Sequence, residues 1–387
     1  MRHIKALAAS AALALAGPAW AQTPGVTDTE IKLGGAHDLS GIFAPFSVPA
    51  VAAANAYFKK VNDEGGINGR KITYIVEDHG YQVPKAAQAA NKLINRDEVF
   101  AMLLNLGTPH NIAMFQLMGP KGIPNVSPIT AARQMIEPFE PWKFAGTSSY
   151  YDAILATTEA MIEGEGTKKV CLMLLPTDFG KEIEAAVHKL AEDGKIELGA
   201  EISHKPDESD FTGALGKVKD SGCDTIGMAL GVSQMINAIA TARKLGMDQK
   251  IMLSGAGFHT VVAKGLAQQG VMDGVYAGAG WQDLEARMGD PEVQEFVASY
   301  KEATGEDYPG TGALLGHAGA RIMVEALKAA GPDLTHESFI KAMESLNYED
   351  KVAGNTVTFS AEDHAGADEV FVSKIQDGSW VLVNTIK

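Results

Sequence analysis

The chain has 387 residues, 46% of them hydrophobic, and its formal net charge is −15. This length is enough for two domains, each with its own hydrophobic core. The excess of acidic side chains argues against nucleic acid or an anionic membrane as partner, although a local group of donors can still bind an anion.

Residues 1–21 have the pattern of a secretory signal peptide. A basic start at Arg2 precedes an apolar segment at 6–15, and an A-x-A cleavage motif ends at Ala21. No later apolar run of about 18 residues follows, as a membrane helix would need. We therefore expect cleavage after Ala21 and a soluble protein in the periplasm.

The first half of the remaining chain alternates between strand and helix patterns. Strands are expected at 30–36, 71–77, 99–104 and 123–126, and helices from about 48 to 61, at 84–94 and at 109–118. This alternation predicts right-handed βαβ units around a parallel sheet.

The same pattern restarts at Lys169. Strands are expected at 170–175, 196–203, 224–230 and 251–253, with helices from 181, at 211–219 and at 233–245. Later helices are expected at 295–303, 313–330 and 336–345, followed by a hairpin at 370–385 that turns at Asp377-Gly378. Two α/β lobes in tandem fit this pattern, with the late segments covering them rather than forming a third domain.

The turn after the third expected strand has features of an anion site. Gly107 is followed by Thr108 at the expected N-cap and by Pro109 at the first helical position. Such turns lie at the carboxyl ends of parallel strands, where ligands bind, and a helix N-terminus favours a carboxylate. The alternative is an ordinary turn without a ligand. For His110 a ligand donor and a surface residue are both open, and Ile112, Phe115 and Met118 or Leu117 are expected on one side of the helix.

Two cysteines, Cys171 and Cys223, each stand near the start of an apolar run in the same half of the chain. An exported chain could oxidise them to a disulfide. Two buried thiols that merely pack are the alternative, and the sequence leaves both open.

Motifs of catalytic and metal sites are missing from the sequence. The histidines are scattered, and there is no CxxC, HExxH or G-x-S-x-G pattern. Gly255-Ala256-Gly257 lacks the context of a nucleotide site. We therefore expect a protein that is not an enzyme, with no catalytic residue, metal or cofactor.

A set of short motifs spans nearly the whole chain after the signal segment. The most specific is Gly65-Gly66-Ile67-Asn68-Gly69-Arg70-Lys71-Ile72, joined by Leu39-Ser40-Gly41, Glu77-Asp78, Gly107-Thr108, Ser127-Pro128, Asp178-Phe179-Gly180, Asp210-Phe211 and Tyr308-Pro309. Together they resemble the branched-chain amino-acid-binding family, the Leu/Ile/Val-type periplasmic solute-binding proteins of ABC transporters.

This resemblance implies a type I periplasmic-binding fold, in which two Rossmann-like lobes with parallel sheets are joined by a three-crossover hinge and close on a ligand. On this chain the crossovers fall near Thr147, Gly278 and Glu369. The N-terminal lobe would be 27–147 plus 279–369, and the C-terminal lobe 148–278 plus 370–387. The implied partner is an ABC permease in the inner membrane, and a monomer is expected.

The resemblance also implies how the ligand carboxylate is held. The turns Leu106-Gly107-Thr108 and Ile129-Thr130-Ala131 take the places of the family's carboxylate-binding turns, with hydroxyls and helix N-terminal amides as donors. The family commonly has a threonine where Ala131 stands, so the sequence leaves open which hydroxyl reaches the ligand.

The second lobe departs from the family pattern. Gly255 aligns with the acidic residue that holds a ligand ammonium, and Gly231 with an aromatic residue. A buried ammonium without a counter-charge is costly. Aromatic walls are expected from Phe46, Phe179 and one of Tyr150 and Tyr151, which point opposite ways if the crossover is extended. Phe46 and Phe179 could equally be core residues.

The sequence therefore predicts an exported solute-binding protein of an ABC importer that traps a small carboxylate, preferably an aromatic or hydrophobic organic acid. A protein that binds branched-chain or other hydrophobic amino acids is one alternative. A ligand-sensing domain for a membrane receptor is another, against which we count the end of the chain at Lys387 without a membrane segment.

Overall fold

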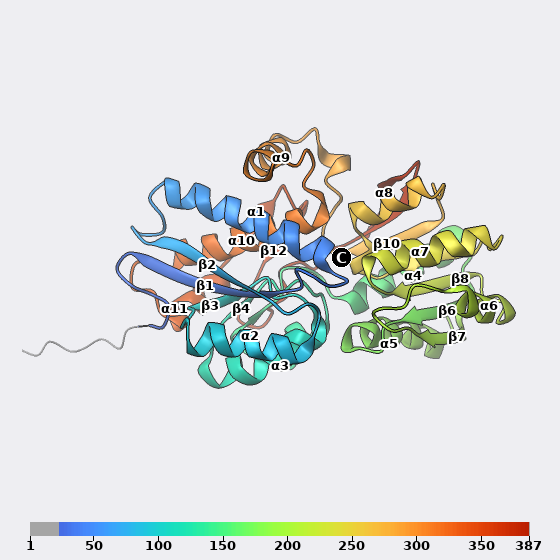
Figure 1. Ribbon diagram of the computed structural model, residues 1–387, viewed down its shortest axis with the longest axis horizontal. Coiled ribbons are helices and arrows are strands. Elements are labelled where there is room, and N and C mark those ends of the chain that lie inside the picture. The colour runs from blue at the N-terminus through green and yellow to red at the C-terminus, as the bar shows by residue number, and fades with distance from the viewer. Residues whose placement is uncertain (1–22, 387) are drawn as a thin grey trace, which may run out of the picture.

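The computed structural model describes residues 23–386, so the expected signal peptide at 1–21 lies outside the described residues. Within residues 23–386 the chain forms two α/β lobes side by side (Figure 1). No helix in this described range is both long and apolar enough to cross a membrane. The expected fold class, α/β with two parallel-sheet lobes, is confirmed.

The first lobe is built on a parallel sheet with the strand order β2-β1-β3-β4-β5. Its strands are β1 (Glu30–His37), β2 (Lys71–Asp78), β3 (Ala101–Leu103), β4 (Asn125–Val126) and β5 (Lys143–Phe144). Its helices are α1 (Ala44–Asp63), α2 (Val83–Asn95) and α3 (Thr108–Met118), joined by the late helices α9 (Pro291–Thr304), α10 (Gly310–Ala330) and α11 (His336–Met343).

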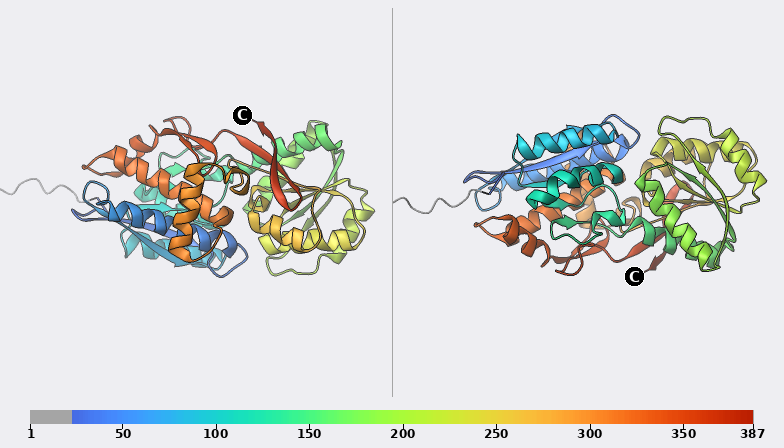
Figure 2. Two further views of the ribbon diagram at one scale, coloured as in Figure 1. Left: turned by 90° about the horizontal axis from the view of Figure 1, so that it is seen from above. Right: turned by 90° about the horizontal axis from the view of Figure 1, so that it is seen from below.

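Different helices cover the two faces of this sheet, because side chains alternate between the faces along each strand. Leu33 of β1 shares a hydrophobic cluster with Phe58 of α1 and Ile322 of α10. Met102 of β3 instead shares a cluster with Met114 of α3. Both views in Figure 2 show the late helices, coloured orange, lying with the first lobe.

The second lobe contains a larger sheet with the strand order β14-β13-β10-β9-β8-β6-β7, parallel except at β13 and β14. Its strands are β6 (Lys169–Leu174), β7 (Glu197–Ser203), β8 (Thr225–Ala229), β9 (Lys250–Leu253), β10 (Val275–Ala279), β13 (Val370–Gln376) and β14 (Ser379–Ile386). Its helices are α4 (Tyr150–Glu165), α5 (Asp178–Glu192), α6 (Thr212–Asp220), α7 (Val232–Lys244) and α8 (Thr260–Gln268).

The chain crosses from one lobe to the other three times. The crossings lie between β5 and α4, after β10, and before β13. A separate small sheet pairs β11 (Asn347–Asp350) with β12 (Asn355–Thr358). The expected hairpin is present as β13–β14, which turns at Asp377-Gly378. The residue boundaries expected for the two lobes stay a prediction.

Two helix starts differ from the expectation. Helix α1 begins at Ala44 rather than near residue 48, and Pro49 lies within it. Helix α3 begins at Thr108, so Gly107 rather than Thr108 is its N-cap, with φ at 96°. Thr108 does not cap because its hydroxyl bonds to Thr130 instead.

The inner face of α3 also differs from the expectation. Met118 is buried as expected, and Asn111 and Met114 are also fully buried, whereas Ile112 and Phe115 are only partly buried. The reason is that the polar side chain of Asn111 turns inward to bond the preceding turn.

Cys171 of β6 and Cys223, which precedes β8, form a disulfide with their Cα atoms 5.8 Å apart. Gly199 of the neighbouring strand β7 leaves the room for it, because a Cβ there would overlap the sulfur of Cys223. The alternative of two packed thiols is therefore wrong for this structure.

Candidate functional site

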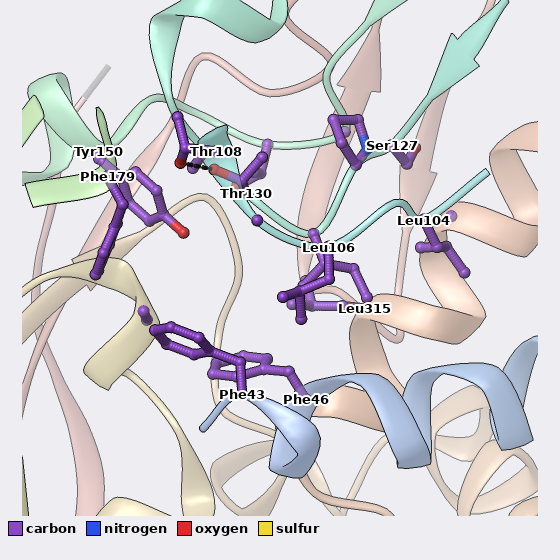
Figure 3. Close-up of a pocket in the computed structure, with 18 of the residues that line it drawn as sticks. Phe43, Phe46, Leu104, Leu106, Thr108, Ser127, Thr130, Tyr150, Phe179 and Leu315 are labelled. Atoms are coloured by element: carbon purple, nitrogen blue, oxygen red, sulfur yellow. Dashed lines mark hydrogen bonds between the residues drawn. The ribbon is translucent and has the colours of Figure 1, made fainter. Parts of the chain in front are cut away.

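A cavity lies between the two lobes at the carboxyl ends of the strands, with a volume of about 70 Å³ for the centres of water-sized spheres. The segments that follow β1 to β5 supply most of its wall, and α10 and the second lobe supply the rest (Figure 3). Its lining residues are Phe43, Phe46, Tyr81, Leu104, Leu106, Gly107, Thr108, Ser127, Pro128, Ile129, Thr130, Ala131, Gly146, Thr147, Tyr150, Phe179, Ala256, Trp281, Leu315, Ala318, Gly319 and Ile322.

Most of the site residues predicted from the sequence line this cavity. They are Phe46, Leu106, Gly107, Thr108, Ile129, Thr130, Ala131, Tyr150 and Phe179. Their contact with a ligand stays a prediction. Three further predicted residues, Tyr151, Gly231 and Gly255, do not line the cavity.

Each of these three lies outside the cavity for a structural reason. Helix α4 begins at Tyr150, so the crossover is not extended there and Tyr151 turns away to lie against the Arg133 guanidinium, 3.9 Å from the ring centre. A Cβ at Gly231 would lie 3.1 Å from Ile42, in the contact between the lobes. A Cβ at Gly255 would lie 3.4 Å from the Tyr150 ring, behind the cavity wall.

Several lining residues were missed from the sequence. Phe43 and Ser127 belong to turns that carry the family motifs, which was the available signal. The α10 residues and Trp281 gave no signal, because they come from a region more than a hundred residues away. The α10 residues reach the cavity through the packing of α10 on α1.

Three hydroxyl groups meet at one end of the cavity. Thr108 Oγ1 and Thr130 Oγ1 are hydrogen-bonded at 2.6 Å (Figure 3). Burial raises the pKa of the Tyr150 hydroxyl to about 12, against hydrogen bonds with the Ala131 backbone and the Thr130 side chain that act in the opposite direction. The Tyr150 hydroxyl therefore stays protonated at neutral pH and can donate a hydrogen bond. We call Thr108, Thr130 and Tyr150 the hydroxyl cluster of the cavity.

A buried asparagine network fixes the turn that carries Thr108. The Asn105 amide nitrogen donates to Asn125 Oδ1 at 2.8 Å, and Asn105 Oδ1 accepts from the Ala36 amide at 2.8 Å. Asn111 Nδ2 donates to the carbonyls of Asn105 and Gly107 at 3.0 and 2.9 Å. Satisfied buried networks of this kind are rigid, so the turn that carries Thr108 is held in place before any ligand arrives.

Backbone strain is concentrated along the cavity. Six non-glycine residues of the described chain have positive φ, and three of them, Tyr81, Leu104 and Ser127, line the cavity with φ of 55°, 57° and 46°. A left-handed conformation costs a non-glycine residue about 1 kcal/mol. Such residues gather at functional sites, where the surrounding structure holds them in place.

Neutral histidines form the layer behind the Thr108 turn. His79 Nε2 donates to the Leu106 carbonyl at 3.2 Å, and its ring stacks on His110 with centroids 4.5 Å apart. Burial lowers the pKa of His79 to about 3 and that of His110 to about 4. His110 is only 1% exposed and does not line the cavity. It is therefore neither the surface histidine nor the ligand donor considered from the sequence.

The rest of the lining is uncharged and largely apolar. No aspartate, glutamate, lysine, arginine or histidine is among the described residues that line the cavity. Its mouth is aromatic, with Phe179 of the second lobe 5.9 Å from Phe43 and 5.2 Å from Tyr150 between ring centroids. Such a lining suits a ligand with one polar end and a hydrophobic body.

Contacts between the lobes close the cavity at its rims. Arg133 Nε of the first lobe donates to Glu182 of α5 at 3.0 Å, and the Glu182 side chain is 4% exposed. On another side His259 Nε2 donates to the Pro45 carbonyl at 3.2 Å, and its ring packs on Phe46. The two lobes are thus in contact on two sides of the cavity.

One further polar cluster lies outside the cavity. Glu184 and His188 of α5 and Glu201 of β7 have potential ligand atoms within 4.8 Å of one another, and His188 is hydrogen-bonded to Glu201. The sequence did not reveal this group, because its members belong to two elements that meet only in the fold.

Comparison with known proteins shows the family. The family described as "Periplasmic binding protein" matches residues 30–379. The leucine-, isoleucine-, valine-, threonine- and alanine-binding protein of Pseudomonas aeruginosa is 21% identical over 343 residues, which cover 88% of each chain.

Two solved structures have the same architecture. The fatty acid ABC transporter substrate-binding protein from Thermomonospora curvata is 25% identical, with a TM-score of 0.84, and the match covers 94% of this chain and 93% of that one. An ABC transporter solute-binding protein from R. palustris in complex with benzoate is 21% identical, with a TM-score of 0.80, and the match covers 92% and 96%. With nearly its whole length matched, the chain belongs to the periplasmic binding protein family, whose members bind solutes and are not enzymes.

Proposed function

We propose that this protein captures a small organic acid with an aromatic or hydrophobic body and delivers it to an ABC permease in the inner membrane. The observation that carries this proposal is the uncharged lining of a cavity between the lobes with hydroxyl groups at one end. The names of the T. curvata and R. palustris proteins, which refer to fatty acid and benzoate, support the same class of ligand.

The carboxylate of the ligand would take hydrogen bonds from Thr108, Thr130 and Tyr150. The two threonine hydroxyls bond to each other, so a carboxylate can accept from one or both after they turn. The N-terminus of α3 adds a favourable dipole at the same place. Hydrogen bonds to an ionised group contribute about 1.5 to 3 kcal/mol each.

An amino acid is the second candidate, supported by the name of the P. aeruginosa relative. Its ammonium would need a counter-charge or several acceptors, because burying an unpaired charge is costly. Gly255 and Gly231 stand where the amino-acid binders carry an acid and an aromatic residue, and the lining offers no carboxylate. We therefore place the organic acid first.

A ligand panel tests the proposal. We expect benzoate, 3-phenylpropanoate or hexanoate to raise the melting temperature measured by differential scanning fluorimetry, and leucine and valine to leave it unchanged. A large rise with leucine or valine and none with the acids would reverse the order of the two candidates.

Thr108→Val tests the carboxylate end. This change keeps the shape of the side chain and removes the hydroxyl, so we expect the acid that binds best to lose about 10- to 100-fold in affinity by calorimetry. Thr212→Val, at the exposed start of α6, is the control and should bind normally. Unchanged affinity for Thr108→Val would remove Thr108 from the site.

A further inference from the structure

The cavity continues past the hydroxyl cluster into the first lobe, where α10 forms part of its wall. Figure 3 shows Leu104 and Ser127 at the end opposite Tyr150 and Phe179, with Leu315 of α10 below them. We call this part the inner end. Its lining residues are Leu104, Ser127, Gly146, Leu315, Ala318, Gly319 and Ile322.

Small residues keep the inner end open. A Cβ at Gly319 would lie 2.6 Å from Leu104 Cδ2, and one at Gly146 would lie 2.8 Å from Ser127 Oγ. Gly312, two turns earlier on the same side of α10, has a different role, because a Cβ there would lie 2.6 Å from the Phe46 carbonyl and would push α10 off α1. Packing of α10 on α1 therefore accounts for Gly312, whereas Gly319 and Gly146 border the inner end.

Ser127 is the polar residue of this apolar end, and its hydroxyl is unused. Its Oγ is buried and has no hydrogen-bond partner within residues 23–386, although its backbone amide donates to the Phe144 carbonyl at 2.8 Å. Ser127 also has a φ of 46°. A buried unpaired hydroxyl and a left-handed backbone are both unfavourable. Their coincidence at one cavity residue is typical of a residue that binds a ligand.

The distance between Ser127 and the hydroxyl cluster suits a short ligand. Ser127 and Thr130 are three residues apart on one segment, so their Cα atoms can be at most about 11 Å apart. This upper limit leaves room for one aromatic ring with a carboxylate at one end and a polar substituent at the other. The surrounding Leu104, Leu315 and Ile322 are apolar, so the substituent must be uncharged.

We propose that the inner end is a subsite for an uncharged hydrogen-bonding substituent, a hydroxyl or a carbonyl, that the ligand carries away from its carboxylate, with Ser127 Oγ as its partner. The ligands of this class are hydroxy-substituted aromatic acids. This inference rests on the proposed function, because the hydroxyl cluster must bind the carboxylate for the substituent to reach Ser127.

Matched pairs of ligands test the subsite. The pairs are 4-hydroxybenzoate with benzoate and 4-hydroxyphenylacetate with phenylacetate, measured by isothermal titration calorimetry. For the wild type we expect the hydroxylated member of at least one pair to bind about 10-fold more tightly. Ser127→Ala should remove this preference and leave the affinity for the unsubstituted acid within about 2-fold.

Two further variants protect the test. Ser127→Gly also removes the hydroxyl but favours the left-handed backbone, so it should fold at least as well as the wild type and show the same loss of preference. Ser254→Ala changes another buried serine whose Oγ has no partner in the described structure, outside the cavity, and should keep the preference.

The outcomes separate the two proposals. If the acids bind and the Ser127 variants lower both members of a pair equally, or neither, the subsite is wrong and the proposed function stands. If none of the four acids binds and leucine does, the proposed function is wrong and the subsite falls with it.

Discussion

Tyr150 and Tyr151 are adjacent in sequence, yet only Tyr150 faces the cavity. Burial keeps its hydroxyl protonated, with a pKa of about 12, and this hydroxyl is one of the three donors of the hydroxyl cluster. We expect Tyr150→Phe to weaken the binding of an organic acid about 10-fold in calorimetry, because it removes one hydrogen bond and keeps the ring.

The natural control for this change is Tyr151→Phe, which alters the same chemical group one residue later. Its ring lies against Arg133 outside the cavity, so affinity should stay within about 2-fold of the wild type. Equal effects of the two changes would contradict the placement of Tyr150. The sequence narrowed this choice to two residues but not to one, because the start of α4 decides which ring turns inward.

The disulfide is also a feature of single residues, and it closes a loop with a sequence separation of 52 residues between Cys171 and Cys223. Loop closure restricts the unfolded chain, so we expect the double change Cys171→Ser and Cys223→Ser to lower the free energy of unfolding by about 2 to 4 kcal/mol. Urea unfolding of the variant and of the reduced wild type should give similar midpoints. Ligand affinity should not change, because neither cysteine lines the cavity.

At the scale of elements, β1, β2 and α3 together bury a group of histidines. Burial lowers the pKa of His37 and His79 to about 3 and that of His110 to about 4, against about 6.5 in an unfolded chain. The unfolded state therefore binds more protons as the pH falls below about 6.5. The stability that these histidines contribute is complete above pH 6.5 and is lost as the pH falls towards 4.

We thus expect the melting temperature to fall steadily below pH 6.5. Asp283 acts in the opposite sense, because burial raises its pKa to about 6, but it is outnumbered by the histidines. His110→Phe keeps a ring stacked on His79 and removes one titrating group, so it should make the fall less steep. An unchanged pH profile would mean that His110 has the same pKa in the folded and unfolded states.

The elements themselves were predicted well where the pattern is local. Strands β1 and β2 follow their apolar alternation, and the hairpin β13–β14 follows from Asp377-Gly378. The two-residue strand β5 was missed, because a segment of that length carries no periodicity. The start of α3 was misplaced by one residue, because the Thr108 hydroxyl pairs with Thr130, a partner that local sequence cannot reveal.

For the whole molecule, the Arg133–Glu182 pair connects the two lobes. Arg133→Ala would leave the nearly buried Glu182 without its charged partner, which favours the open form. We expect affinity for every bound acid to fall by a similar factor, about 10-fold, and the ligand-free protein to have a larger radius of gyration in small-angle X-ray scattering.

Lys181→Ala is the matched control for this change. Lys181 pairs with Asp178 on the same helix, but the pair is exposed and does not join the lobes, so closure should be normal. If Arg133→Ala lowered affinity for one ligand only, a local contact rather than closure would explain the effect.

The cavity wall is divided unequally between the lobes. The ends of β3 and β4, the α10 residues and Phe43, Phe46 and Tyr81 all belong to the first lobe, whereas Tyr150, Phe179 and Ala256 come from the second. We therefore expect a ligand to dock first on the first lobe, and the second lobe then to cover it. We therefore expect the first lobe to determine the association rate of the ligand. The contacts made by the second lobe should determine its residence time. In stopped-flow experiments, loosening the Arg133–Glu182 pair should accelerate ligand release and leave the rate of arrival nearly unchanged.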